Sequence, residues 1–333
     1  MQKLMQKFMH GLIKVQKIIK SIQMRKDIKM KSSIQFRLVI LVLLGLATCF
    51  NGLIAQDSTA AAPVKVAKAK GYVKNTFEGN FILDNQTVMV PIKGTLEATI
   101  QHRFGIMNNG FTDLFGIFSG ANMRLGVNYT PVKNLLLGFG VTNDRMQVDF
   151  TAKLALLKQT KDNSMPVSVT YYGNALMDTR AKNSSLPIVS FSDRMAYFNQ
   201  LIIARKFSDR LSLQVAPSIT YFNNVPAYLD VKGNVTPAMQ NAHLAIAFSG
   251  KIRLTPGTSL LLNYDQPLTQ HPMDNPHPNL SFGLEFHTSG HDFQIFAGNY
   301  GFAEPEDNNV QNTNDYTKGQ YLIGFNISRL WNF

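Results

Sequence analysis

The last fifteen residues of the chain, Gly319 to Phe333, alternate between apolar side chains and small or polar ones. Only Arg329 interrupts the apolar parity, which comprises Tyr321, Ile323, Phe325, Ile327, Trp331 and Phe333. The opposite parity carries mainly small and polar residues, among them Gly324, Asn326 and Ser328. A period of two places alternate side chains on opposite faces of a β-strand. The pattern therefore predicts one long strand with an apolar and a mainly polar face.

The same alternation recurs from Gly94 onward in twelve segments. They cover residues 95–104, 121–129, 135–142, 146–156, 167–177, 195–206, 211–221, 244–254, 260–265, 280–287, 293–300 and the closing stretch. Single-chain bacterial barrels have an even number of strands. We therefore predict an all-β protein, a twelve-stranded antiparallel transmembrane β-barrel behind a cleaved signal peptide, integral to the bacterial outer membrane.

The connections distinguish this barrel from a soluble β-sandwich, whose strands also alternate. Residues 130–134, 207–210, 255–258 and 288–291 are short turns, whereas several of the intervening connections are long and rich in Asn and Pro. Membrane barrels combine short periplasmic turns with long external loops. Two connections depart from this rule, since residues 143–144 are short for an external loop and residues 158–165 are long for a periplasmic turn.

Aromatic residues gather near the predicted strand ends, as in the interfacial girdles of membrane barrels. We expect an outer belt and a periplasmic belt. The outer belt is expected to contain Phe104, Tyr171, Tyr172, Tyr197, Phe198, Tyr221, Phe222 and Tyr300. The periplasmic belt is expected to contain Tyr129, Phe286, Trp331 and Phe333.

The net charge of +12 is confined to the amino-terminal part of the chain. Residues 1–37 contribute +9 and residues 56–74 contribute +3, so residues 75–333 are neutral. A basic protein that binds nucleic acid would carry its charge on the folded domain. The distribution therefore argues against a nucleic-acid partner.

The amino-terminal segments read as export signals. Residues 38–50 are thirteen apolar or small residues behind a basic flank, which suits the hydrophobic region of a signal peptide better than an uncleaved anchor. We assign residues 30–55 to the signal peptide, with cleavage between Ala55 and Gln56. We interpret residues 1–29 as an extended or mis-annotated leader before a start at Met30, and a basic amphipathic helix is the alternative.

Residues 56–93 are assigned to a periplasmic segment and residues 94–333 to the barrel. Residues 60–70 are low in complexity and read as a tether, whereas residues 77–91 are expected to pair locally or to lie against the barrel mouth. The sole cysteine, Cys49, falls within the signal peptide in a poor lipobox. The mature chain is therefore expected to contain no disulfide and no cysteine metal site.

Few residues are candidates for catalysis or metal binding. His271 and His277 flank Asp274 in a loop, where a solvated loop is a simpler interpretation than a metal site. A lipid-acting enzyme of the outer-membrane phospholipase class would need a lipid-facing histidine, for which His102 is the candidate. No serine aligns securely beside it, so we expect no enzyme activity, no metal and no cofactor.

The polar parity of the first strands carries charges of both signs, namely Glu97, Arg103, Arg124, Asp149 and Lys153. These lumen-facing residues either pair with one another and fill a narrow interior or form a constriction that selects a solute. Gly138 and Gly140 face the same side and leave room for Arg124 or for a passing molecule.

Several blocks resemble an uncharacterised membrane-bound β-barrel family of Gram-negative bacteria. They are HRFG at 102–105, FSDR at 191–194, LIIARKFSDRLSL at 201–213, SGHDFQ at 289–294 and GFNISR at 324–329. The resemblance implies an outer-membrane barrel but no functional residues. The closing strand also resembles that of outer-membrane barrels, which implies that Trp331 and Phe333 form part of an insertion signal.

These observations favour a channel or transporter for small polar solutes. A non-porous barrel that anchors or displays its loops is the first alternative, and a lipid-acting enzyme is the second. The expected partners are outer-membrane lipid, the barrel-insertion machinery and a small polar solute.

Overall fold

The structure, a computed structural model, describes residues 71–182 and 188–333. The predictions for residues 1–29, for the signal peptide at 30–55 and for cleavage at Ala55 and Gln56 lie outside these described residues.

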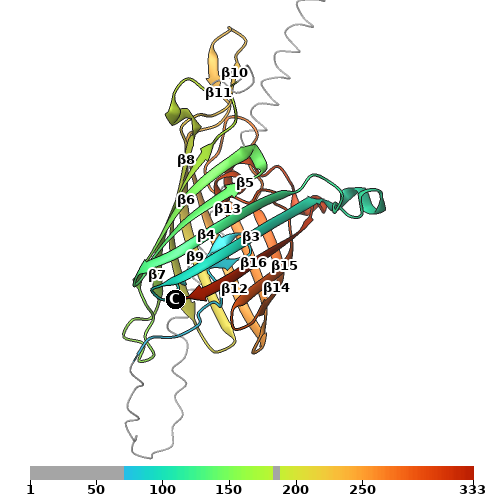
Figure 1. Ribbon diagram of the computed structural model, residues 1–333. Helices are drawn as coiled ribbons and strands as arrows, with labels where there is room; N and C mark the ends of the chain where they lie inside the picture. Colours follow the sequence, from blue (N-terminus) through green and yellow to red (C-terminus); the bar gives the residue numbers. More distant parts are fainter. Residues whose placement is uncertain (1–70, 183–187) are drawn as a thin grey trace, which may run out of the picture. The chain divides into compact units, whose positions relative to one another are not determined.

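Twelve strands form a closed antiparallel barrel, as predicted (Figure 1). They are β3 (Thr95–Ile106), β4 (Asn122–Val132), β5 (Leu135–Thr142), β6 (Gln147–Leu157), β7 (Ser168–Asp178), β8 (Met195–Lys206), β9 (Leu211–Phe222), β12 (Ala242–Thr255), β13 (Thr258–Pro267), β14 (Asn279–His287), β15 (His291–Gly298) and β16 (Leu322–Asn332). The last strand pairs with the first, with Trp331 opposite Leu96 and Ile327 opposite Ile100. This closure leaves no strand edge, because unpaired backbone groups in hydrocarbon would cost several kcal/mol each.

Each strand presents an apolar face to the lipid and a polar face to the lumen. On β4, Leu125 and Val127 are exposed outward, whereas Arg124 and Asn128 are buried inside the barrel. The parity of the sequence therefore assigns these faces correctly, because successive side chains of a strand point to opposite sides. Among the described residues, no helix is long and apolar enough to cross a bilayer.

Short turns gather at the end of the barrel that contains Thr95 and Asn332, which identifies it as the periplasmic end. The outer end carries one short loop, which contains the helical turn η2 (Asp144–Met146), and several long connections. The long connections contain η1 (Met107–Asp113), η3 (Phe191–Arg194), η4 (Tyr316–Lys318) and the hairpin of β10 (Ala227–Leu229) and β11 (Val235–Pro237).

The unusually long periplasmic connection after β6 has a structural explanation. Val73 N–H donates to the carbonyl of Gln159 at 2.8 Å, and Lys161 N–H donates to that of Gly71 at 2.9 Å. The connection therefore holds the segment that precedes the barrel.

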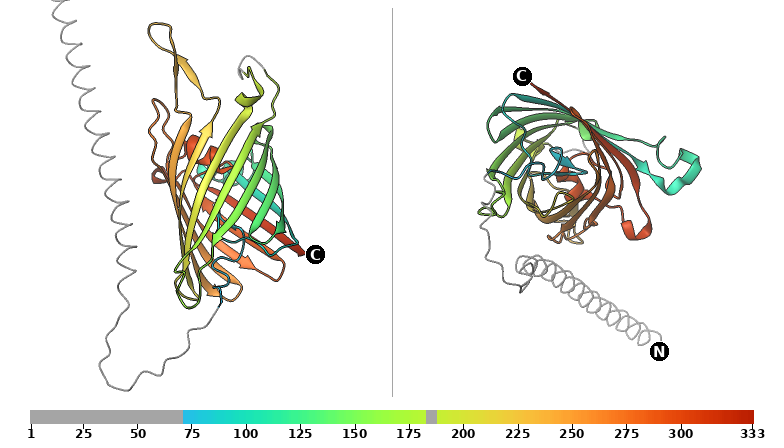
Figure 2. Two further views of the ribbon diagram at one scale, coloured as in Figure 1. Left: turned by 90° about the vertical axis from the view of Figure 1, so that its left-hand side faces the viewer. Right: turned by 90° about the horizontal axis from the view of Figure 1, so that it is seen from below.

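Two short elements lie inside the ring of strands rather than in its wall (Figure 2). One is the hairpin of β1 (Phe81–Ile82) and β2 (Asn85–Gln86), and the other is the helix α2 (Pro305–Gln311) of the loop between β15 and β16. The sequence predicts local pairing for residues 77–91, which the hairpin shows. However, the segment enters the lumen instead of lying against the mouth.

The predicted aromatic belts need correction. Tyr172, Phe198 and Tyr300 are buried inside the barrel, where they join a lumen cluster with Phe77 and Leu83. Tyr171 points outward but pairs with Leu154 in the periplasmic half, not the outer half. Proximity to a strand end does not determine on which face an aromatic ring lies, and the lumenal segments provide apolar partners inside.

Candidate functional site

The structure places all five predicted lumen residues, Glu97, Arg103, Arg124, Asp149 and Lys153, inside the barrel, each no more than 5% exposed. Arg124 and Asp149 form a two-pronged contact, in which Nε and Nη2 donate to the carboxylate at 2.9 and 2.7 Å. The other three contact groups that the sequence does not place in the lumen. These groups belong to two segments, which we call the N-terminal insert (residues 76–90) and the outer insert (residues 299–312).

The N-terminal insert contacts strands on all sides of the lumen. Asn85 donates to Asp265 of β13 at 2.7 Å and accepts from Gln200 of β8 at 3.0 Å. On the opposite wall, Asn326 of β16 donates to the carbonyl of Leu83 at 2.6 Å. These bonds satisfy the polar groups of a segment that is cut off from water.

Apolar side chains anchor the same insert. Phe77, Ile82 and Leu83 are no more than 2% exposed and pack in the lumen cluster. Burial of each such side chain contributes about 1.5–3 kcal/mol. The closed arrangement is therefore the stable one for this segment.

The outer insert enters from the opposite end of the barrel. Tyr300 donates to Ser281 of β14 at 2.9 Å, and Glu304 accepts from Thr142 of β5 at 2.8 Å. Asp307 of α2 accepts from Gln147 of β6 at 2.8 Å and pairs with Arg145 of η2 at 3.0 Å. The short loop at residues 143–146 thus gives Arg145 access to α2.

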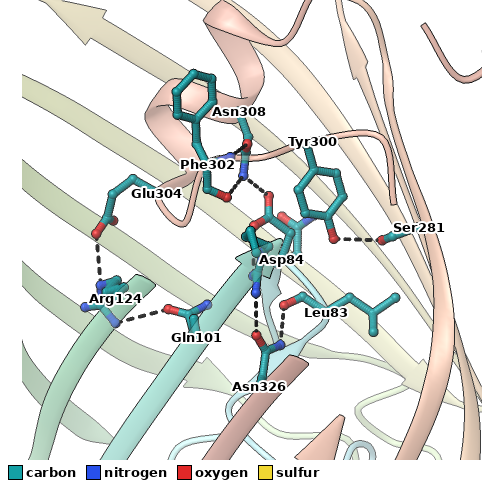
Figure 3. Close-up of polar contacts among 12 residues, drawn as sticks. Leu83, Asp84, Gln101, Arg124, Ser281, Tyr300, Phe302, Glu304, Asn308 and Asn326 are labelled. Atoms are coloured by element: carbon teal, nitrogen blue, oxygen red, sulfur yellow. Dashed lines mark hydrogen bonds and ion pairs between the residues drawn. The ribbon is translucent and has the colours of Figure 1, made fainter. Parts of the chain in front are cut away.

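The two inserts meet where Asp84 and Asn308 come together (Figure 3). Asn308 of α2 donates to Asp84 of the N-terminal insert at 2.9 Å, and Arg103 of β3 lies 3.6 Å from the same carboxylate. Burial raises the pKa of Asp84, and the charge of Arg103 opposes that increase. The junction therefore couples both inserts to the wall.

Arg124 lies beside this junction and contacts two carboxylates. Its Nε lies 3.0 Å from Glu304, in addition to its contact with Asp149 (Figure 3). Burial raises the pKa of Glu304 well above its usual range, as does repulsion from Asp149, while Arg124 opposes both effects. Gly140 leaves space for the side chains of Arg124 and Asp149, because a Cβ at this position would lie 2.6 Å from Arg124 Cζ.

A third charged group lies toward the periplasmic end. Glu78 of the N-terminal insert accepts from Lys251 of β12 at 2.9 Å and lies 3.3 Å from Arg253. Burial alone would raise the pKa of Glu78, but the hydrogen bond and charge of Lys251 outweigh it and lower the pKa.

Cavities inside and above the inserts differ greatly in size. Two cavities lined partly by the inserts measure about 10 Å³ each, close to the space of one water molecule. A cavity of about 670 Å³ opens at the outer mouth and includes Arg145, Arg194, Asp178, Phe222 and Gln311 in its lining. We call this cavity the vestibule. The structure thus has a large cavity at the outer mouth, and the two small cavities beside the inserts each have room for about one water molecule.

A pair of histidines lies near the outer end of β12. His243 of β12 and His271 of the loop at 268–278 are joined at 2.8 Å between Nδ1 and Nε2, and their rings stack. Gln240 N–H donates to His271 Nδ1 at 3.1 Å, so His271 carries its proton on Nε2. Burial lowers the pKa of His271, which favours this neutral form.

The remaining candidates from the sequence occupy separate positions. His102 faces outward, and its ring stacks on Phe325 at 4.9 Å between centroids. Within residues 71–182 and 188–333, no group of three or more His, Cys, Asp and Glu side chains could hold a metal ion. Phe333 lies exposed at the periplasmic end, and its N–H donates to Gly94 at 3.3 Å.

The sequence interpretation missed both inserts and therefore Asp84, Glu304, Asp307 and Asn308. A signal was present in residues 299–312, where a run of Asn and acidic residues contains no Lys or Arg. Asn and acidic residues are also common in solvated loops, so the lumen location of this segment depends on contacts with several distant strands.

Comparison with protein families finds one match, over residues 77–331, to the family described as "Membrane bound beta barrel domain (DUF5777)". No curated protein sequence matches the chain.

Solved structures with a similar fold include the NanC porin, at 9% identity and a TM-score of 0.43, covering 72% of this chain and 99% of that chain. The COG4313 outer membrane channel from Pseudomonas putida F1 has 13% identity and a TM-score of 0.42, covering 73% and 97%. The toluene transporter TodX from P. putida has 15% identity and a TM-score of 0.27, covering 64% and 49%.

Proposed function

The chain belongs to the membrane-bound β-barrel domain family and is an integral outer-membrane barrel, and from this premise we propose that it is a channel for small polar solutes, closed by its two inserts. The observation that carries the proposal is the character of the contacts between inserts and wall. Many are hydrogen bonds and ion pairs of polar side chains, such as those of Asn85, Asp84 and Glu304.

Polar contacts of this kind can be replaced by water when a segment moves, whereas an interior packed with apolar side chains loses its stabilisation on hydration. A barrel of twelve strands lies between the packed eight-stranded and the open sixteen-stranded size classes. Removal of two inserts from its lumen would therefore leave space for a small solute.

The vestibule supports the same proposal. Its lining includes Gln311 of α2 and Arg145 of η2, which contact each other. A solute that enters the vestibule from outside therefore reaches the outer insert first. Movement of that insert would disturb the Asp84–Asn308 contact and so affect the N-terminal insert.

The filled lumen also favours a second function. Cavities of about 10 Å³ between inserts and wall, together with the buried apolar anchors, suit a non-porous barrel that displays its outer loops to a partner. The two functions differ in whether the inserts leave their position in the folded protein.

Conductance in planar bilayers, combined with the swelling of proteoliposomes as glucose enters them, distinguishes the channel from the non-porous barrel. Wild-type protein is expected to open rarely. Asn308→Asp places a second carboxylate against Asp84 across the 2.9 Å contact and should raise the open frequency several-fold at pH 8. Asp84→Asn combined with Asn308→Asp removes the repulsion and should return the frequency toward wild type.

Heat-modifiable mobility on gels confirms that each variant is folded. Folded wild-type and Asn308→Asp proteins that are both silent would exclude the channel and support the non-porous barrel.

A further inference from the structure

The two inserts are acidic and contain no basic residue. Residues 76–90 and 299–312 contain no Lys or Arg, and their acidic side chains are Glu78, Asp84, Glu304, Glu306 and Asp307. All five are buried in the barrel. A buried carboxylate must be paired or hydrogen-bonded to offset the loss of hydration, so the partners of these groups reveal what the lumen wall provides.

In the outer half, Asp307, Glu304 and Asp84 each face an arginine of the wall or its connecting turn, whereas Glu306 accepts from the amide of Asn174 at 3.5 Å. Arg145 lies 3.0 Å from Asp307, and Arg124 lies 3.0 Å from Glu304. Arg103 in turn lies 3.6 Å from Asp84 of the N-terminal insert. Arg103 and Arg124 come from adjacent strands, β3 and β4, so these cations line one side of the lumen.

The partners in the periplasmic half complete the series. Lys153 Nζ donates to the carbonyl of Asn80 at 3.1 Å, an oxygen of the N-terminal insert. Lys251 and Arg253 both contact Glu78, at 2.9 and 3.3 Å. Basic groups therefore follow one another from the outer mouth to the periplasmic end, and each meets an oxygen of an insert.

The carboxylates of the wall behave differently, because each keeps a partner on the barrel itself. Asp149 accepts from Arg124, and Asp292 contacts His287. The other three wall carboxylates accept hydrogen bonds from side-chain amides of the wall. Asn128 donates to Glu97, Gln294 donates to Glu285 and Asn263 donates to Asp265, at 2.8–2.9 Å. Displacement of the inserts would remove an insert oxygen from each of these basic groups. Arg124 would keep Asp149 and Arg103 would keep Asn326, while Lys251 and Arg253 would lose the carboxylate of Glu78.

We propose that the inserts occupy a path for anions, and that the solute of this channel is a small carboxylate-bearing molecule. The carboxylates of the inserts hold the positions that a carboxylate of the solute takes as it passes from one basic group to the next. Rings of Arg and Lys favour anions in pores. This inference rests on the proposed channel function and gives it a substrate class.

Matched solutes test the inference in proteoliposomes containing the Asn308→Asp variant. Gluconate, glucose and glucosamine are similar in size and differ in charge. Gluconate should enter several-fold faster than glucose, and glucosamine should be slowest. In bilayers under a KCl gradient, the sign of the reversal potential should report chloride preference.

Variants of the wall identify the responsible groups. Arg103→Gln combined with Lys251→Gln should abolish the preference for gluconate, whereas Arg103→Lys combined with Lys251→Arg should preserve it. Glucose flux in the same variants reports whether the pore remains intact. Glucose flux without anion preference, or with preference for glucosamine, would overturn this inference alone. The absence of flux for all three solutes in folded protein would overturn the channel and this inference together.

Discussion

Arg124 joins the barrel wall to the outer insert, because its guanidinium contacts Asp149 of β6, Glu304 of the insert and Gln101 of β3. A guanidinium can serve several carboxylate oxygens at once through its fixed fork of donors. Gly140 provides the space that this arrangement needs. The location of a basic residue on the inner face follows from parity, but its shared role depends on a loop far away in the sequence.

Arg124→Ala should lower the free energy of unfolding by about 3–5 kcal/mol, because it leaves two buried carboxylates without their cation. Urea unfolding followed by the fluorescence of Trp331, the single tryptophan, measures the change. Arg210→Ala in an exposed periplasmic turn is the control and should cost little. A loss of less than about 1 kcal/mol for Arg124→Ala, the range of surface ion pairs, would contradict a structural role for this contact.

At the scale of elements, the strands were predictable and the inserts were not. In a pleated strand, successive side chains point to opposite faces of the sheet, regardless of which strand pairs with it. Alternation therefore located all twelve strands and predicted that Glu97 and Lys153 point inward. Residues 299–312 have no such period, and their place in the lumen is determined by bonds to several strands, including those of Thr142 and Ser281. The adjacent apolar residues Ile82 and Leu83 indicate that their segment is buried, but they do not indicate where in the protein it is buried.

The loop at residues 268–278 should loosen as the pH falls. The pKa of His271 is lowered by burial, so the unfolded loop binds a proton more readily than the folded one. The stabilisation of the folded loop by neutral His271 is complete above the ordinary histidine pKa of about 6.5. It declines as the pH falls below that value. A protonated His271 would also direct Nδ1–H at the N–H of Gln240.

Limited proteolysis of this loop at pH 7.5 and 5.5 measures the effect. Wild-type protein should be cleaved faster at pH 5.5, and His271→Phe should lose most of the pH dependence. His277→Gln in the same loop is the control and should retain it. Equal cleavage rates of the wild type at both pH values, normalised to protease activity, would exclude the effect.

For the whole molecule, the carboxyl terminus bears on assembly rather than on stability. Phe333 is 86% exposed, so its deletion removes little buried surface from the finished barrel. We expect the deletion to reduce the amount of folded protein in the outer membrane while leaving the melting of the inserted fraction nearly unchanged. Phe333→Tyr should behave like the wild type. Heat-modifiable gel mobility reports both quantities, and normal insertion of the deletion variant would disprove the signal role.

In the proposed channel the inserts must move for solutes to pass, and a reversible cross-link tests this requirement. A Cβ at Gly79 of the N-terminal insert would lie 3.9 Å from Asp292 Cβ on β15, within the range of disulfides. Cys49 lies in the predicted signal peptide, so Gly79→Cys and Asp292→Cys would form the only pair in the mature chain. The two single-cysteine variants control for the substitutions themselves.

The measurement is glucose flux into proteoliposomes carrying this cysteine pair in the Asn308→Asp background, before and after reduction. We predict that the oxidised protein is closed and that reduction restores the flux of the Asn308→Asp protein, while the single-cysteine variants do not respond. Equal flux in the oxidised and reduced states would contradict a gate formed by the N-terminal insert.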